Sequence, residues 1–244
     1  MAEPHHRTEA SGVDRWAAQI AALTSPPKAP QTRKDPLDAG RVVAAALEIV
    51  EREGFDALTM RRVAAALGTG PASLYAHVRN KAELDDLLIG RLCAAVALPT
   101  PDPKGWESQV LDVCRQLRDQ FLRYPGLSRA ALTATPNSLD TLRISEGMLA
   151  ILLAGGVAAR PAAWAIDAAY LYVCAYSLET SLRTSGGVDG RILERDDTVA
   201  RFRMLPTDHF PHTVEHAEEL AAGEGHERFE FTLRTLFAGL SAGR

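Results

Sequence analysis

Apolar residues recur at helical spacing from residue 38 to the end of the chain. They return every three or four positions, which places them on one face of an α-helix, and the sequence contains no convincing alternating apolar–polar run bounded by hairpin turns. Glycine or proline separates successive periodic segments, as expected where helices end. The pattern therefore predicts an all-α fold.

The first four predicted helices carry clear boundary signals. Thr59 is a suitable N-cap for the second of them, which stops at Gly68. Pro71 is acceptable in the first turn of the third, and closely spaced prolines end the fourth. We expect these four helices over residues 36–53, 59–67, 71–77 and 81–97.

Longer helices are expected in the second half of the chain, and their ranges are 104–123, 138–153, 160–184, 213–222 and 227–238. Residues 185–212 form the only long stretch without strong periodicity, so we expect a loop there. We also expect a short amphipathic helix over residues 14–23.

Composition and charge favour a protein that folds unaided inside the cell. A chain of 244 residues can bury a sizeable core without disulfides. The odd number of cysteines (Cys93, Cys114 and Cys174), all in apolar helical patterns, indicates buried free thiols in a reducing compartment. No apolar run approaches the roughly 20 residues of a membrane span, and the first residues lack a secretory signal. A cytoplasmic location is expected.

The net charge of −4 hides a local excess of positive charge. Residues 57–82 carry four basic side chains and no acidic one. Upstream, the proline-broken segment of residues 1–35 forms a basic N-terminal arm that we expect to be mostly flexible. Two interpretations of that arm stay open: a solvated tail, or contact with DNA phosphates or the minor groove by Arg33 and Lys34.

Residues 58–88 (LTMRRVAAALGTGPASLYAHVRNKAELDDLL) combine a helix, a tight glycine-containing turn and a second short helix. That arrangement is typical of a helix-turn-helix, in which a small, alanine-rich first helix lets the second pack across it. The second helix would expose short and polar side chains toward base edges. The expected mini-core consists of Val63, Ala64, Leu67, Leu74 and Val78.

Residues 36–88 resemble the DNA-binding domain of the Tet-repressor (TetR) family, and LYAHVRNKAELDDLL is similar to its tetracycline-repressor branch. The resemblance implies a helix-turn-helix domain over residues 36–88 and a ligand-binding and dimerisation domain over residues 89–244. It also implies a homodimeric repressor that binds a palindromic operator and is released by a small-molecule inducer. One departure from the branch is Ala76, where a large aromatic residue is expected, so the operator sequence is expected to differ.

Carried over by position, the resemblance assigns DNA contacts to individual residues. Thr59 falls at a phosphate-contacting helix start, and Arg61 falls where a base edge is read, which suits guanine. Arg62 is more typical of a solvated helix surface, and Tyr75 has the alternative of packing in the mini-core. The remaining base-reading positions are Pro71, Ala72 and Ser73, and the phosphate-contacting positions are Tyr75, His77 and Lys81.

The predicted helix over residues 160–184 carries the main candidates for a ligand pocket. Trp164, Asp167, Leu171 and Cys174 share one face at spacings of three and four. Such a stripe is more often core, but apolar and aromatic walls with few polar groups are also what a pocket needs. Tyr170 would add a polar group to the wall. Weaker pocket candidates are Trp106, Phe121 and Met148.

Apolar residues occupy more than one face of the last predicted helix, which a lone surface helix would not need. We therefore predict that the last two helices form half of an intersubunit four-helix bundle. The expected interface residues are Val214, Leu220, Phe229, Leu233, Leu236 and Phe237.

No cofactor or metal is predicted. A tetracycline–magnesium inducer would need a histidine near Ala131, although Glu179 matches an acidic residue of the branch's metal shell. His212 and His216 are four apart and would share a helix face with metal-ligand spacing, with His209 nearby. Without a clear third ligand, a polar helix start is the favoured interpretation of these histidines.

An enzyme is not predicted, because the sequence lacks a phosphate-binding glycine loop, a nucleophile elbow and a His-Glu metal motif. The alternative to a repressor is a helical small-molecule-binding or interaction protein without operator specificity. The two differ in salt dependence, since operator binding weakens steeply as salt rises.

Overall fold

The computed structural model describes residues 17, 20–21, 37–133, 138–184 and 195–241, in which helices are joined by turns and loops and there is no strand. The all-α prediction is confirmed. The elements are α2 (Ala39–Glu53), a 3-10 turn η1 (Phe55–Ala57), α3 (Met60–Ala66), α4 (Pro71–Tyr75), α5 (Lys81–Ala94), α6 (Trp106–Arg123), α7 (Leu127–Thr133), α8 (Leu139–Ala154), α9 (Ala159–Thr184), α10 (Arg195–Arg203), α11 (Pro211–Glu215), α12 (Ala217–Leu220) and α13 (Glu227–Ser241).

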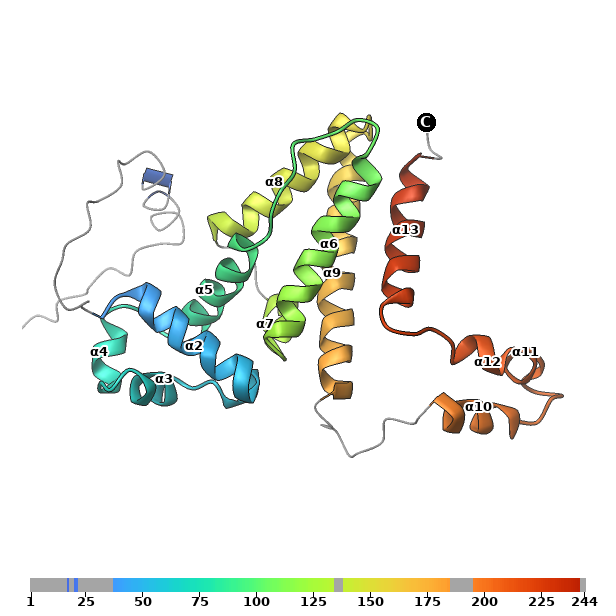
Figure 1. The fold of residues 1–244 in the computed structure, drawn as a ribbon, viewed down its shortest axis with the longest axis horizontal. Helices are drawn as coiled ribbons and strands as arrows, with labels where there is room; N and C mark the ends of the chain where they lie inside the picture. The colour runs from blue at the N-terminus through green and yellow to red at the C-terminus, as the bar shows by residue number, and fades with distance from the viewer. Residues whose placement is uncertain (1–16, 18–19, 22–36, 134–137, 185–194, 242–244) are drawn as a thin grey trace, which may run out of the picture.

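Figure 1 shows three parts of the molecule. Helices α2, α3 and α4 form a small unit at one end, and α5 leads from it into a body built from α6, α7, α8 and α9. Helix α13 lies alongside α9 and also packs against α6. The short helices α10, α11 and α12 pack on one another in a separate lobe, which we call the α10–α12 lobe.

One connected apolar core runs through the small unit and the body. It extends from Val42 in α2 to Phe237 in α13, both of which are buried. Helix α5 contributes to both parts, because it packs against α2 and also against α6, α7 and α8. No helix in the described part of the chain is long and apolar enough to cross a membrane.

Three differences from the predicted helices concern α2, the segment around His216, and α10. Helix α2 begins at Ala39 because the Asp38 side chain caps it, accepting a hydrogen bond of 2.8 Å from the Arg41 backbone N–H. The predicted helix over residues 213–222 is divided at His216, whose φ of −106° and ψ of 30° depart from helical values. Helix α10 lies inside residues 185–212, where a loop was expected.

Helix α7 was not predicted at all. It is seven residues long and follows Gly126, whose φ is 86°. Two of its residues, Leu127 and Ala131, are buried in the connected apolar core. A segment of two turns is too short to give a clear period in the sequence, so its helical state depends on packing against α9 and α5.

Candidate DNA interface and ligand cavity

The α3–α4 unit is fixed by local hydrogen bonds at both ends of α3. The Thr59 side-chain oxygen accepts from the backbone N–H of Arg62 at 3.2 Å, which confirms it as an N-cap. At the other end Gly68 has φ +64°; its N–H donates to the Ala65 carbonyl at 3.1 Å, and the Thr69 N–H donates to the Ala64 carbonyl at 3.0 Å. This pair of bonds is a Schellman motif, which requires a residue in the left-handed backbone conformation, and glycine adopts that conformation without strain.

Four of the five predicted mini-core residues are fully buried. Leu67, the fifth, is half-buried and packs against the same core. Pro71 occupies the first turn of α4, and Leu74 in the same helix points inward. The four fully buried residues are Val63, Ala64, Leu74 and Val78.

The opposite face of α4 is open to solvent. Tyr75 is 51% exposed, so its side chain is not part of the mini-core. Arg61 on α3 is also exposed and has no acidic partner among the ion pairs of the described residues, whereas Arg62 is paired with Glu53. Arg61 is therefore available to a partner, and Arg62 is engaged within the chain. The exposed candidates on and after α4 are Pro71, Ala72, Ser73, Tyr75 and His77.

Lys81 differs from the other candidates because its ammonium group already has partners. It pairs with Asp85 and lies 3.9 Å from the centre of the Phe55 ring. Burial raises the pKa of Asp85, although the hydrogen bond from Lys81 opposes that shift. A phosphate at this position would have to compete with Asp85 for Lys81.

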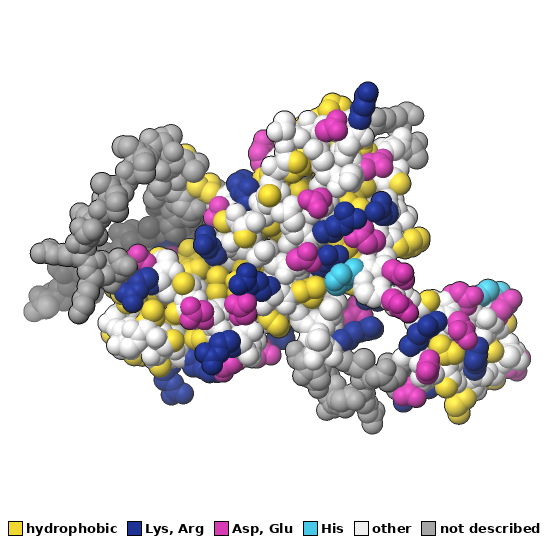
Figure 2. Space-filling model, in the orientation of Figure 1, with side chains coloured by type: hydrophobic (Ala, Val, Ile, Leu, Met, Phe, Trp, Pro, Cys, Tyr) yellow, Lys and Arg dark blue, Asp and Glu magenta, His cyan; other side chains and the backbone are white. Residues whose placement is uncertain are grey.

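At the lower left of Figure 2, where α3 and α4 lie in Figure 1, Lys and Arg side chains project from the surface.

A cavity of about 440 Å³ lies in the body of the protein. Its walls come from α5, α6, α8 and α9, and most of the wall residues are apolar. Five polar side chains join them, and no Lys, Arg or His is among the lining residues. The apolar and thiol members are Cys93, Cys114, Leu117, Leu142, Ile144, Met148, Leu149, Ala163, Ile166 and Val173; the polar members are Thr141, Ser145, Glu146, Asp167 and Tyr170.

The titratable groups in the cavity wall, other than its two carboxylates, are held neutral by burial. Burial raises the pKa of the Cys93 thiol to about 11 and that of Cys114 to about 12. It also raises the pKa of the Tyr170 hydroxyl, which is hydrogen-bonded to Cys174 behind it. Because Glu146 and Asp167 are exposed acids in this wall, the cavity combines a neutral apolar interior with negative charge.

Three of the predicted pocket residues lie in the cavity wall, namely Met148, Asp167 and Tyr170. Cys174 is buried beside Tyr170 without lining the cavity. Trp106 and Phe121 are buried in the core, whereas Trp164 and Leu171 are 69% and 46% exposed. Three further wall residues on α8 were not predicted, since no spacing signal marks which face of α8 meets α9; they are Thr141, Ser145 and Glu146.

The predicted interface residues divide into two groups. Phe229, Leu233 and Phe237 are fully buried and face their own chain, where α13 packs against α6 and α9. Val214 and Leu236 are half-buried, and Leu220 is 59% exposed. The sequence shows that α13 has several apolar faces, but it does not show which of them the same chain covers.

Ion pairs fix α13 on α6. The Arg115 guanidinium donates two hydrogen bonds to the Glu230 carboxylate, at 2.7 and 2.6 Å, and these bonds lower the pKa of Glu230. The buried Arg118 lies 4.7 Å from the centre of the Phe229 ring. On α9 and α13 themselves, the large apolar side chains that are exposed are Trp164, Leu171 and Phe231.

The residues relevant to a tetracycline–magnesium site do not meet in a ligand set. Ala131 is buried and offers no donor. The Glu179 carboxylate pairs with Arg183 at 3.0 Å and also accepts a hydrogen bond from Arg228. Arg33 and Lys34, the predicted DNA contacts of the N-terminal arm, lie outside the described residues.

Comparison with known proteins gives matches to two sequence families. Residues 42–85 match "Bacterial regulatory proteins, tetR family", and residues 98–244 match "Tetracyclin repressor-like, C-terminal domain". The HTH-type transcriptional repressor DrrR1 of Streptomyces coeruleorubidus is 37% identical over 126 residues, which are 49% of this chain and 45% of that protein. The chain thus matches about half the length of this first curated relative.

Other relatives match over most of their length. The tetracycline repressor protein class G of Vibrio anguillarum is 29% identical over 206 residues, covering 83% of this chain and 93% of that protein. The crystal structure of the Streptomyces coelicolor TetR family protein ActR in complex with actinorhodin is 38% identical, covers 85% of this chain and 97% of that chain, and has a TM-score of 0.77. The matched families are families of transcription regulators rather than known enzymes. With the second family match alone spanning more than half of its residues, the chain belongs to the TetR family of bacterial regulatory proteins.

Proposed function

We propose that this protein is a ligand-responsive transcriptional repressor that binds a palindromic operator as a homodimer and releases it when a small molecule enters the cavity. The observation that carries the proposal is the outward face of α4. Its short and polar side chains are exposed on the far side of a fully buried mini-core, as the recognition helix of a helix-turn-helix requires. The family match over residues 42–85 supports the same assignment.

The proposed DNA contacts divide into base reading and positioning. Arg61 is exposed and unpaired among the described ion pairs, so its guanidinium is free to form a bidentate contact with guanine. Ala72 and Ser73 at the start of α4 are short enough to let the backbone approach base edges. Thr59, Tyr75 and His77 would contact phosphates and set the register. Lys81 would join them after exchanging Asp85 for a phosphate.

Dimerisation gives the protein two recognition helices at a fixed separation of about 34 Å, one turn of DNA. The exposed apolar residues Trp164 and Leu171 on α9 and Phe231 on α13 supply a surface that a partner would cover. Because α9 and α13 lie side by side, two copies of the pair would form a four-helix bundle (Figure 1). This assigns the interface to the outer faces of α9 and α13 and leaves Phe229, Leu233 and Phe237 in the core of each subunit.

Helix α5 provides a physical connection between the cavity and the DNA-binding unit. It packs against α2, and its residue Cys93 lines the cavity. A ligand that fits the cavity better when α5 is displaced would shift the population toward dimers with a different separation of their α4 helices. The ratio of the ligand's affinities for the two conformations of the dimer then sets the largest factor by which DNA affinity can fall.

The cavity wall also limits the chemistry of the ligand. Its size and apolar surface suit a small aromatic or polycyclic compound. Glu146 and Asp167 favour a neutral or positively charged ligand, because no basic side chain lines the cavity to pair with an anion. A direct check uses two probes with one ring system, 9-(aminomethyl)anthracene and 9-anthracenecarboxylate. The amine should bind more tightly, and tighter binding of the carboxylate would contradict this ligand class.

The test of DNA binding compares two adjacent arginines on a DNA sequence selected from a random pool. Arg61→Ala removes a contact worth about 1–3 kcal/mol in each of two half-sites, so the affinity of the dimer should fall at least about 30-fold. Arg62→Ala is the matched control, since Arg62 is paired with Glu53 and should change affinity far less. Fluorescence anisotropy over a range of salt concentrations should also show affinity falling steeply with salt for the unaltered protein. Equal, small effects of both variants would contradict the assignment of Arg61.

The alternative function, a helical small-molecule-binding protein without operator specificity, makes the opposite predictions. It retains the cavity and its ligand but gives no enriched sequence from the random pool. Its interaction with DNA would be weak and would not depend on Arg61.

A further inference from the structure

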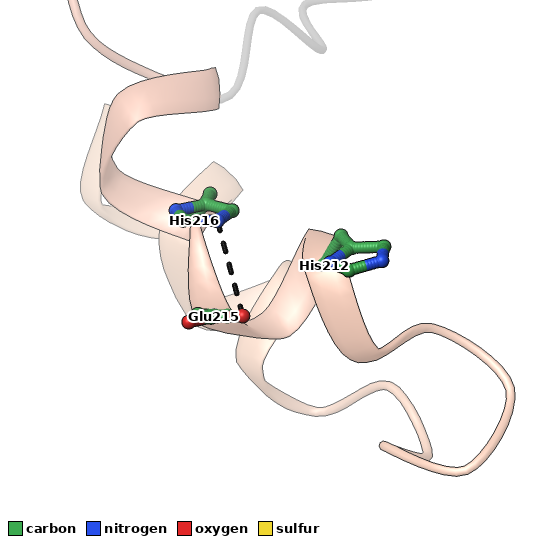
Figure 3. Close-up of side chains that lie close together, drawn as sticks. All are labelled: His212, Glu215 and His216. Atoms are coloured by element: carbon green, nitrogen blue, oxygen red, sulfur yellow. Dashed lines mark ion pairs between the residues drawn. The ribbon is translucent and has the colours of Figure 1, made fainter.

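Three potential metal ligands meet on the surface of the α10–α12 lobe. His212, Glu215 and His216 each offer one ligand atom, and these atoms all lie within 4.8 Å of one another (Figure 3). All three side chains are exposed. The sequence alone indicates two histidines four residues apart, and the structure adds the carboxylate that completes a set of three.

The backbone fixes the two histidines one helical turn apart. Pro211 begins α11, and the His216 N–H donates to the His212 carbonyl at 2.9 Å, which closes the turn. Residues related in this way lie on one face of a helix, so both imidazoles can reach the same point in solvent. Glu215 lies beside them, with its Oε2 atom 3.8 Å from His216 Nε2 (Figure 3).

The other charges of the lobe leave this carboxylate available. Glu218 pairs with Arg203 at 2.7 Å and with Arg195 at 3.8 Å. Among the ion pairs of the described residues, Glu215 has no Lys or Arg partner; it pairs with His216. His209, in the preceding turn, is 3.7 Å from Asp208 and does not belong to the cluster.

We propose that His212, Glu215 and His216 bind a divalent zinc-class ion. Imidazole nitrogens select zinc, nickel or copper over magnesium and calcium, and a carboxylate oxygen completes a common zinc ligand set. Bonds of about 2.0–2.1 Å in a tetrahedron place ligand atoms about 3.4 Å apart, so the three exposed side chains must close together slightly on binding. The fourth position is open to water. The bound ion would hold the end of α11, where the helix is interrupted at His216, and would so stabilise the lobe.

The test is a zinc chloride titration of the untagged, full-length chain by isothermal calorimetry. Because His5 and His6 form a second histidine pair, both are first replaced by alanine, and every variant carries those changes. The background protein should bind one zinc ion per chain. His212→Ala and His216→Ala should each weaken binding by at least about tenfold. His209→Ala is the control from the same lobe and should bind zinc as the background protein does.

Circular dichroism melts in EDTA establish that each variant folds, which alanine at an exposed position should not prevent. Zinc should raise the melting temperature of the background and His209→Ala proteins, and magnesium should not. The proposal is overturned if the background protein shows no saturable zinc binding, or if His209→Ala weakens binding as much as His212→Ala. DNA affinity is not the readout, so this result is independent of the proposed function.

Discussion

Replacing Gly68 by alanine tests the turn that positions the recognition helix. At φ +64° an alanine Cβ meets no atom within 4 Å, so the cost arises from the backbone conformation and not from a clash. A left-handed residue other than glycine costs roughly 1–2 kcal/mol. If the turn instead relaxes, it loses the Gly68–Ala65 and Thr69–Ala64 hydrogen bonds, worth about 1 kcal/mol each. Both routes give a loss of about 1–2 kcal/mol in the free energy of unfolding.

The assay is guanidinium unfolding followed by circular dichroism, at one fixed protein concentration because a dimer's stability depends on it. A thermal melt at the same protein concentration should show a melting temperature that is lower by about 2–8 °C. Gly68→Asn is the matched control, since asparagine tolerates the left-handed region better than alanine, and it should retain part of the lost stability. Equal stability of the alanine variant and the unaltered protein would refute the assignment of a Schellman turn at Gly68.

Three further predictions concern the body of the protein. Gly155→Ala places a Cβ 2.4 Å from Cγ of the buried Trp106 ring, so the free energy of unfolding should fall by about 1–3 kcal/mol. Gly239→Ala is the control: the new Cβ lies in open space within α13, so this variant should raise the free energy of unfolding slightly. Hydrogen bonds from Arg115 lower the pKa of the Glu230 carboxyl below its ordinary value of 4.5. The ionised carboxylate therefore stabilises the folded protein above pH 4.5, and this stabilisation is lost as the pH falls through the lower pKa of the native state. Glu230→Gln should therefore be less stable than the unaltered protein near neutral pH and approach it in acid, and a constant difference across an acid titration would contradict this. The thiols of Cys93, Cys114 and Cys174 are buried and have raised pKa values. They should resist Ellman's reagent in the native protein at neutral pH and react with it in guanidinium. Rapid reaction of the native protein would contradict their burial.

The α3–α4 unit was the most predictable part of the structure, because its signals are local. Thr59 caps α3, Gly68 ends it and Pro71 starts α4, and each of these roles depends on neighbours within a few residues. The alanine-rich first helix and the buried Leu74 then follow from periodicity. Such features are written in the sequence itself, without reference to distant segments.

The cavity was much less predictable, because its walls come from four helices far apart in the sequence. Trp164 and Tyr170 lie on the same helix, yet Tyr170 lines the cavity and Trp164 faces solvent. Which face of α9 meets α8 depends on tertiary packing that no local spacing encodes. The same reason explains α13, where Phe229 is covered by its own chain and Phe231 is not.

The most direct test of the central claim is selection of bound DNA from a random pool by the purified protein. We expect an enriched sequence with two-fold symmetry, whose half-sites are centred about one turn apart so that each accepts one α4 helix in the major groove. Repeating the selection with Arg61→Ala should relax the preference at one position in each half-site. A pool that shows no enrichment, or an enriched sequence without symmetry, would contradict operator recognition by a TetR-type dimer.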